Sequence, residues 1–202
     1  LARWCDLYRN EAAATKATAP LALTFGDETF YGAIPQLTPP YSDPDRGREI
    51  RQRMRETHAL RPGFQLLVAC TGPERVVGMA YGYRGTAGQW WHDTVTRALK
   101  PLEAAEWLGD SYELVEIAVH PAVQGHGIGA GLIRELLADR PAATCVLSTR
   151  TDSDAHNLYR RLGFETIIEM PFTNGGYPFY VMGKKLLQMP GRASEGTMMR
   201  DG

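Results

Sequence analysis

The segment HPAVQGHGIGAGLIREL, residues 120–136, places four glycines within seven positions and continues directly into apolar residues at helical spacing. Glycine inside a helix costs about 0.5 to 1 kcal/mol relative to alanine, so a glycine cluster at a helix start needs a reason. Close approach of a ligand to the backbone is such a reason. Because the amides and the dipole at a helix N-terminus favour negative charge, the segment predicts an anion-binding turn.

Three known kinds of glycine turn can be compared with this one. A P-loop requires a lysine after its last glycine, and no lysine lies in this segment. A dinucleotide fingerprint, GxGxxA, is matched by Gly125, Gly127 and Ala130, but the next strand ends in LSTR and not in the expected acidic residue. A merely tight strand-to-helix turn needs one glycine. The last two interpretations stay open as alternatives to a pyrophosphate site that uses no metal.

The spacing Gln124-x-x-Gly127-x-Gly129 follows the apolar strand YELVEIAV by five residues. It resembles motif A of the GNAT acetyltransferase superfamily, [QR]xxGx[GA], which binds the pyrophosphate of acetyl-CoA. The resemblance implies cofactor contacts from the end of the strand and from the turn. These are Ala118, Val119, Gln124, Gly125, His126, Gly127, Ile128, Gly129 and Ala130.

A second segment, LSTRTDSDAHNLYRRLGFE, is similar to motif B of the same family, AxxLYxxxGF. Ala155, Tyr159 and Gly163 fall on this pattern, and the two motifs together extend the resemblance over residues 63–186. The family often has asparagine where this chain has Asp152, which puts that cofactor contact in question, although a carboxylate can still cap a helix. Asp152, Ala155 and Tyr159 complete the expected cofactor contacts.

The resemblance implies an α/β fold. Its central sheet is expected to be mixed and mostly antiparallel, with a splay between the fourth and fifth strands and helices on both sides. The chain patterns predict helices over 2–14, 42–60, 127–139 and 152–163, and two helical pieces over 89–109. Strands are predicted over 20–25, 63–70, 75–83, 112–119, 144–150, 164–170 and 179–187.

Length, charge and cysteine usage restrict the class of protein. We expect one domain over residues 1–187, with residues 1–60 supplying acceptor-site elements, and a disordered tail over 188–202. The net charge of -1 comes from interspersed charges, which argues against a nucleic-acid partner. The sequence lacks CxxC pairs and any apolar run of about 18 residues, so we expect a cytoplasmic protein without a membrane partner.

Two carboxylates in the strand 112–119 are candidates for a catalytic base. Glu113 and Glu116 are three residues apart, so they point to opposite faces unless a bulge intervenes. We expect Glu116 to lie deeper and to act as the base, and a relay through water is the alternative. By resemblance, Tyr159 protonates the departing CoA thiolate, and the Val119 N–H stabilises the developing oxyanion. No metal is expected.

The acceptor pocket is expected to come from segments that vary within the family: 25–41, 42–60, 88–93 and the loop before the last strand. Their aromatic residues suggest a small-molecule primary amine, bound by Tyr41, Trp90, Trp91, Phe172 and Tyr177. A protein acetyltransferase acting on lysines or N-termini and a non-catalytic acyl-CoA-binding module remain alternatives. A homodimer is compatible with the resemblance.

Overall fold

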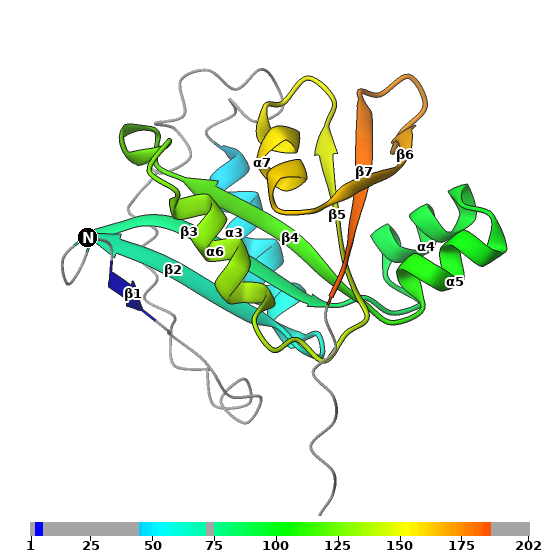
Figure 1. Cartoon of the computed structure of the whole chain (residues 1–202), viewed down its shortest axis with the longest axis horizontal. Coiled ribbons are helices and arrows are strands. Elements are labelled where there is room, and N and C mark those ends of the chain that lie inside the picture. Colours follow the sequence, from blue (N-terminus) through cyan, green and yellow to red (C-terminus); the bar gives the residue numbers. More distant parts are fainter. Residues whose placement is uncertain (1–2, 6–44, 72–74, 187–202) are drawn as a thin grey trace, which may run out of the picture.

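A computed structural model describes residues 3–5, 45–71 and 75–186 of the chain. These residues form a seven-stranded sheet with the order β1-β2-β3-β4-β5-β7-β6 (Figure 1). The strands are β1 (Arg3–Cys5), β2 (Gln65–Thr71), β3 (Arg75–Arg84), β4 (Ser111–Val119), β5 (Thr144–Arg150), β6 (Glu165–Pro171) and β7 (Pro178–Lys185). The helices are α3 (Asp45–Glu56), α4 (Trp90–Ala98), α5 (Pro101–Leu108), α6 (Ile128–Leu137) and α7 (Ala155–Arg161), with short 3-10 turns η1 (His58–Leu60) and η2 (Pro121–Val123).

The sheet opens between β4 and β5. These strands are parallel and pair over three positions, from Ser111 opposite Thr144 to Glu113 opposite Val146. β4 then continues to Val119 and β5 to Arg150, and the two ribbons diverge (Figure 1). The other neighbouring strands pair antiparallel. The predicted mixed, mostly antiparallel sheet with a splay between the fourth and fifth strands is confirmed.

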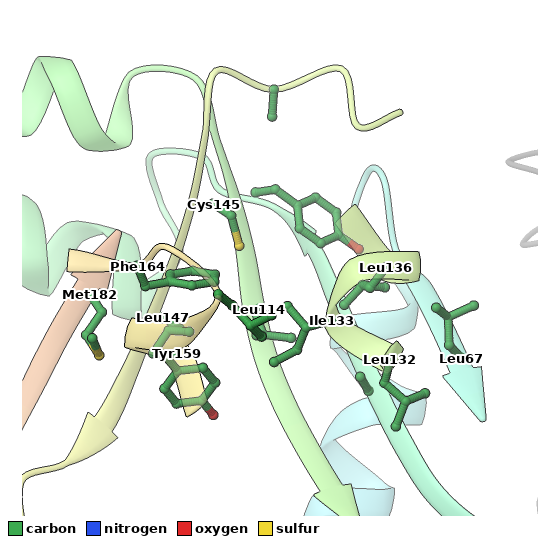
Figure 2. Close-up of a cluster of buried hydrophobic side chains, with 14 of the residues drawn as sticks. Leu67, Leu114, Leu132, Ile133, Leu136, Cys145, Leu147, Tyr159, Phe164 and Met182 are labelled. Carbon is green, nitrogen blue, oxygen red and sulfur yellow. The ribbon is translucent and has the colours of Figure 1, made fainter. Parts of the chain in front are cut away.

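One face of the sheet is covered by α6 and α7. Leu132, Ile133 and Leu136 of α6 are fully buried, as the helical spacing predicted, and they share a cluster with Tyr159 of α7. The strands contribute Leu67, Leu114, Leu147 and Met182 to the same cluster (Figure 2). Both α7 and the glycine turn before α6 therefore approach the opening from this face.

The opposite face is covered by α3 and by the α4–α5 pair. Met54 of α3 packs with Tyr81 of β3, and Val95 and Trp107 pack with Val146 of β5. Val146 lies between Cys145 and Leu147, which belong to the other face, as strand alternation requires. On this face, α3 therefore lies on the β3 side of the opening between β4 and β5, and the α4–α5 pair lies on the β5 side.

The N-terminal prediction is wrong where it can be checked. Arg3–Cys5, expected in a helix over 2–14, form the edge strand β1, which pairs antiparallel with Val68–Cys70 of β2. Hydrogen bonding to a sheet edge outweighs local helix propensity here. The predicted strand 20–25, Tyr41 and the tail 188–202 lie outside the described residues.

Candidate active site

The glycine turn presents open backbone before α6. Gly125 and Gly127 have φ values of 77° and 79°, a left-handed conformation in which side chains are strained, and a Cβ added at either would meet nothing within 4 Å. Gly127 is the N-cap of α6, and Gly131 N donates to Gly127 O at 2.9 Å. The preceding amides at a helix start have no intrahelical acceptor, so they are available to an anion.

Two side chains brace this turn from within. Gln124 Nε2 donates to Val119 O at 3.0 Å, and His126 Nδ1 lies 2.8 Å from Gln124 O. The imidazole of His126 thus contacts the backbone of its own turn. Gln124 joins the turn to the end of β4, which explains a polar side chain at this position.

Gly129 brings three elements together. A Cβ at this position would lie 3.4 Å from Leu158 of α7 and 3.7 Å from Ile117 and Val119 of β4. The first turn of α6 therefore packs closely against both sides of the opening. Three further residues, Ile128, Ala130 and Ala155, are partly buried against the hydrophobic cluster under α6 and α7.

The backbone of Val119 faces the opening. His120 N donates to Val77 O on the β3 side at 2.8 Å, and backbone groups of successive strand residues alternate in direction. The N–H and C=O of Val119 consequently point away from β3. Gln124 Nε2 takes one acceptor position of the carbonyl, and the N–H points to the same side. The Ala118 side chain is 8% exposed and packs on the α3 face.

Tyr159 lies in the wall of the opening. Its ring is buried and meets Phe164 edge-to-face, with ring centroids 5.9 Å apart. Figure 2 shows its hydroxyl at the margin of the cluster, pointing away from Phe164. The ring therefore belongs to the core, and the hydroxyl lies at the edge of the hydrophobic cluster.

Asp152 does not cap α7, contrary to the prediction. It accepts hydrogen bonds from Nε and Nη2 of Arg150, the first at 2.8 Å, and this pairing lowers the pKa of Asp152. Ala155 N donates to Ser153 Oγ at 3.2 Å, so Ser153 serves the helix start. The buried guanidinium of Arg150 captures the carboxylate because a charge-assisted bidentate pair is stronger than a cap.

A bulge in β4 changes the geometry of the two carboxylates. Tyr81 pairs with Glu116 and Gly82 pairs with Leu114, so Val115 is the extra residue. Directly opposed residues share a face, and Tyr81 and Tyr83 are two apart on β3. Glu116 and Glu113, their partners, thus lie on the same face, toward α3.

Glu113, and not Glu116, is the deeper carboxylate. Glu113 is 5% exposed, whereas Glu116 is partly exposed, which corrects the predicted order. Oε1 of Glu113 accepts from the Tyr83 hydroxyl at 3.2 Å, and Oε2 is buried without a partner. Burial raises the pKa of Glu113 to about 7, against lowering contributions from Tyr83 and Arg61.

Further polar residues on this face were missed by sequence reasoning. His58 Nδ1 lies 3.2 Å from the Tyr81 hydroxyl, and its ring centroid lies 5.1 Å from that of Tyr83. Burial, followed by Arg61 and Arg53, lowers the pKa of His58 to about 4, so the imidazole is neutral at pH 7. The only sequence signal for this cluster was the alternation of Tyr81 and Tyr83 in β3. It did not predict their partners, because those depend on the register between β3 and β4.

Four of the predicted acceptor residues gather beyond β5. Trp90 is 63% exposed, and its ring centroid lies 5.7 Å from that of Phe172. Trp91 packs inward and donates from Nε1 to Ser148 Oγ at 3.0 Å. The ring of Tyr177 lies 3.9 Å from the guanidinium carbon of Arg150. Trp90 and Phe172 therefore contact each other, whereas Trp91 and Tyr177 contact residues of β5.

Metal-binding clusters and membrane-spanning helices are both absent from the described residues. Within residues 3–5, 45–71 and 75–186, no cluster of three or more His, Cys, Asp or Glu side chains could hold a metal ion. In the same part of the chain, no helix combines the length and apolar character needed to cross a bilayer.

Replacing Glu113 by Gln should stabilise the protein at high pH. The carboxyl pKa is about 7 in the folded chain and 4.5 ordinarily, so its stability contribution is present below pH 4.5 and is lost as the pH rises through 7. The free energy of unfolding of Glu113→Gln, relative to that of wild type, should therefore increase by up to about 3 kcal/mol when the pH is raised from 5 to 8. Urea denaturation of both proteins at pH 5 and at pH 8 measures this difference in the free energy of unfolding.

The histidine of the same cluster does not obscure this comparison. His58 is present in both proteins, so its titration contributes nearly equally and cancels in the difference. An equal stability difference between the two proteins at pH 5 and pH 8 would contradict the raised pKa of Glu113.

Comparison with known families gives a direct match. Residues 62–166 match the model of the acetyltransferase (GNAT) domain family. This range covers β2 to the start of β6 and includes the glycine turn, the opening and α7.

Two relatives from Mycobacterium tuberculosis share part of the sequence. The chain is 38% identical over 121 residues to the GCN5-like protein acetyltransferase Rv2170, covering 55% of this chain and 59% of that protein. It is 47% identical over 57 residues to the N-alpha-acetyltransferase RimI, covering 28% of this chain and 36% of that protein. The chain thus spans less than two thirds of either relative.

A solved structure supports the fold assignment. A GNAT-family protein from Desulfovibrio desulfuricans aligns over 93% of this chain and 100% of its own, with a TM-score of 0.59 and 14% identity.

Proposed function

Because the chain belongs to the GNAT family of acetyltransferases, we propose that it transfers the acetyl group of acetyl-CoA to a small-molecule primary amine. The observation that carries this proposal is the position of the glycine turn at the opening between β4 and β5. There, unpaired amides, the Val119 N–H and the Tyr159 ring come from three elements that contact one another through Gly129.

The residues of the turn fit the CoA moiety. Gly125 and Gly127 leave space beside the start of α6, where backbone N–H groups favour a pyrophosphate. Bound acetyl-CoA would supply the reactive thioester. The surrounding elements would hold it between β4 and β5, with the Val119 N–H orienting its carbonyl oxygen.

We assign proton transfer to groups on both sides of the opening. The amine nitrogen bonds to the acyl carbon as the carbon–sulfur bond breaks. Glu116, on the α3 side, accepts the proton that the nitrogen loses, and the Tyr159 hydroxyl gives a proton to the leaving sulfur. The acetylated amine and CoA thiol are the products, and no metal takes part in these assignments.

Glu113 is a second candidate for the base. It shares a face with Glu116, and a carboxyl with a pKa of about 7 can accept a proton near neutral pH without being a permanently charged group. Glu113 is buried and Glu116 is partly exposed. Single substitutions can therefore distinguish which of the two carboxylates acts as the base.

The acceptor class has two candidates. The predicted acceptor residues Trp90, Trp91, Phe172 and Tyr177 are aromatic, which suits a small amine, because its ammonium form is attracted to aromatic faces before it loses its proton. A protein amine is the second candidate, because Rv2170 is named a protein acetyltransferase and RimI an N-alpha-acetyltransferase.

An amine panel tests both the activity and the acceptor class. Thiol release from acetyl-CoA would be measured with spermidine, kanamycin, free lysine, a tetrapeptide with a free N-terminus and an N-terminally blocked lysine peptide. We expect turnover with at least one of the first three. Turnover confined to the peptides would replace the small-amine proposal by the protein-amine one, and no turnover at all would contradict the transferase proposal.

A further inference from the structure

Arg61 holds a fixed position beside Tyr83, on the face of the sheet that α3 covers. Its guanidinium carbon lies 4.4 Å from the centroid of the Tyr83 ring. The backbone around it is anchored, because Arg61 N donates to His58 O at 3.0 Å and Phe64 N donates to Arg61 O at 3.2 Å. The cation is therefore placed by the turn that joins η1 to β2.

The other end of Tyr83 contacts the buried carboxyl. The Tyr83 hydroxyl donates to Glu113 Oε1, so a cation, an aromatic ring and a carboxyl follow one another from the surface into the core. Glu113 is at the last paired position of β4 before the sheet opens, opposite Val146 of β5. The backbone of Glu113 is therefore next to the point where β4 and β5 separate, and its carboxyl lies on the α3 face of the sheet.

We propose that Arg61 is a positioning residue of the acceptor site, stacking on Tyr83 and stabilising the negative charge of Glu113 from the outer side of that ring. The inference rests on the proposed function, because it gives Arg61 control over the pH range in which this carboxyl can accept a proton. Arg61 touches neither reacting group and acts through Tyr83 and through the charge of Glu113.

The other described titratable groups around Glu113 supply no positive charge that stabilises its carboxylate. Tyr81 and Tyr83 are uncharged phenols, Cys145 of β5 is a buried thiol whose pKa is raised, and His58 is neutral at pH 7. Arg53 of α3 acts on His58, and Glu116 is the second carboxyl on the face. Among the described residues, Arg61 is the cation whose charge lowers the pKa of Glu113, against the effect of burial.

Neutralising Arg61 should therefore make Glu113 harder to ionise. In Arg61→Gln, we expect the pKa of Glu113 to rise by about 0.5 to 1 unit, measured by carbon NMR titration of the side-chain carboxyls. Glu113→Gln identifies the resonance. The acid limb of the pH–rate profile should move upward by the same amount if Glu113 is the base, with the rate at pH 9 and the KM for acetyl-CoA little changed.

Two further variants separate charge from structure. Arg61→Lys keeps the charge and should retain most of the wild-type pKa. Arg97→Gln removes an exposed arginine that contacts Thr94 of α4, and it should leave the pKa of Glu113 unchanged. An unchanged pKa in Arg61→Gln, or an equal rise in Arg61→Lys, would overturn the inference.

The titration distinguishes this inference from the proposed function. It needs neither acceptor nor acetyl-CoA, so it reports on Arg61 even if no amine of the panel is acetylated. Conversely, activity with an unmoved titration in Arg61→Gln would retain the transferase proposal and remove the role given to Arg61.

Discussion

Gly127→Val is expected to weaken acetyl-CoA binding by at least about 100-fold, which corresponds to about 2.7 kcal/mol. Gly127 is the N-cap of α6 and has a φ of 79°, a conformation that a β-branched residue adopts only with strain. The valine side chain would also fill the open space beside the backbone amides at the start of α6. Loss of even two charge-assisted hydrogen bonds to a pyrophosphate accounts for an effect of this size. Titration calorimetry measures the affinity.

Gly63→Val is the matched control for backbone strain. Gly63 has a similar φ of 69°, and a Cβ there meets Arg84 N at an ordinary 3.5 Å, but it lies in the turn before β2. We expect it to lose stability while its acetyl-CoA affinity stays within about twofold of wild type. Equal affinities in Gly127→Val and Gly63→Val would contradict the assignment of the glycine turn.

Tyr159→Phe is expected to lower kcat by roughly 10 to 10³ with little change in acetyl-CoA affinity. The substitution retains the buried ring and its edge-to-face contact with Phe164, and it removes only the hydroxyl. Steady-state kinetics with an acceptor from the amine panel, together with calorimetry of acetyl-CoA binding, separates the two effects. Lost acid catalysis predicts a change in kcat alone.

The carboxylate variants complete this test. Glu116→Gln should slow the reaction most at low pH, where the amine is mainly protonated, and Glu113→Gln should do so if the buried carboxyl is the base instead. Tyr180→Phe, which alters a tyrosine of β7 near His156 and Arg160, serves as a hydroxyl control. Full turnover in Tyr159→Phe and Glu116→Gln would remove both assigned roles and favour a water chain or slow product release.

The parts of the fold with strong local signals could be predicted from sequence. The glycine turn followed by Leu132, Ile133 and Leu136 at helical spacing identified α6 and its buried face. Pro101 separated α4 from α5, and the β2–β3 hairpin followed from two apolar runs around a short turn. In each case residues near in sequence determine the conformation.

Features that depend on pairing across the chain could not be predicted. The bulge at Val115 is fixed by the register of β4 on β3, and it places Glu113 and Glu116 on one face. The strand character of Arg3–Cys5 comes from the edge of β2, about sixty-five residues away in sequence. Motif matching alone gave Asp152 a capping role, because it contained no information about the guanidinium of Arg150.

A crystal of the protein soaked with acetyl-CoA would locate the pyrophosphate and the thioester. We expect the pyrophosphate within hydrogen-bond distance of amides between Gly125 and Ala130, and the thioester in the opening between β4 and β5, beside the Val119 N–H and the Tyr159 hydroxyl. A pyrophosphate bound away from the glycine turn, or a thioester remote from both Val119 and Tyr159, would contradict it.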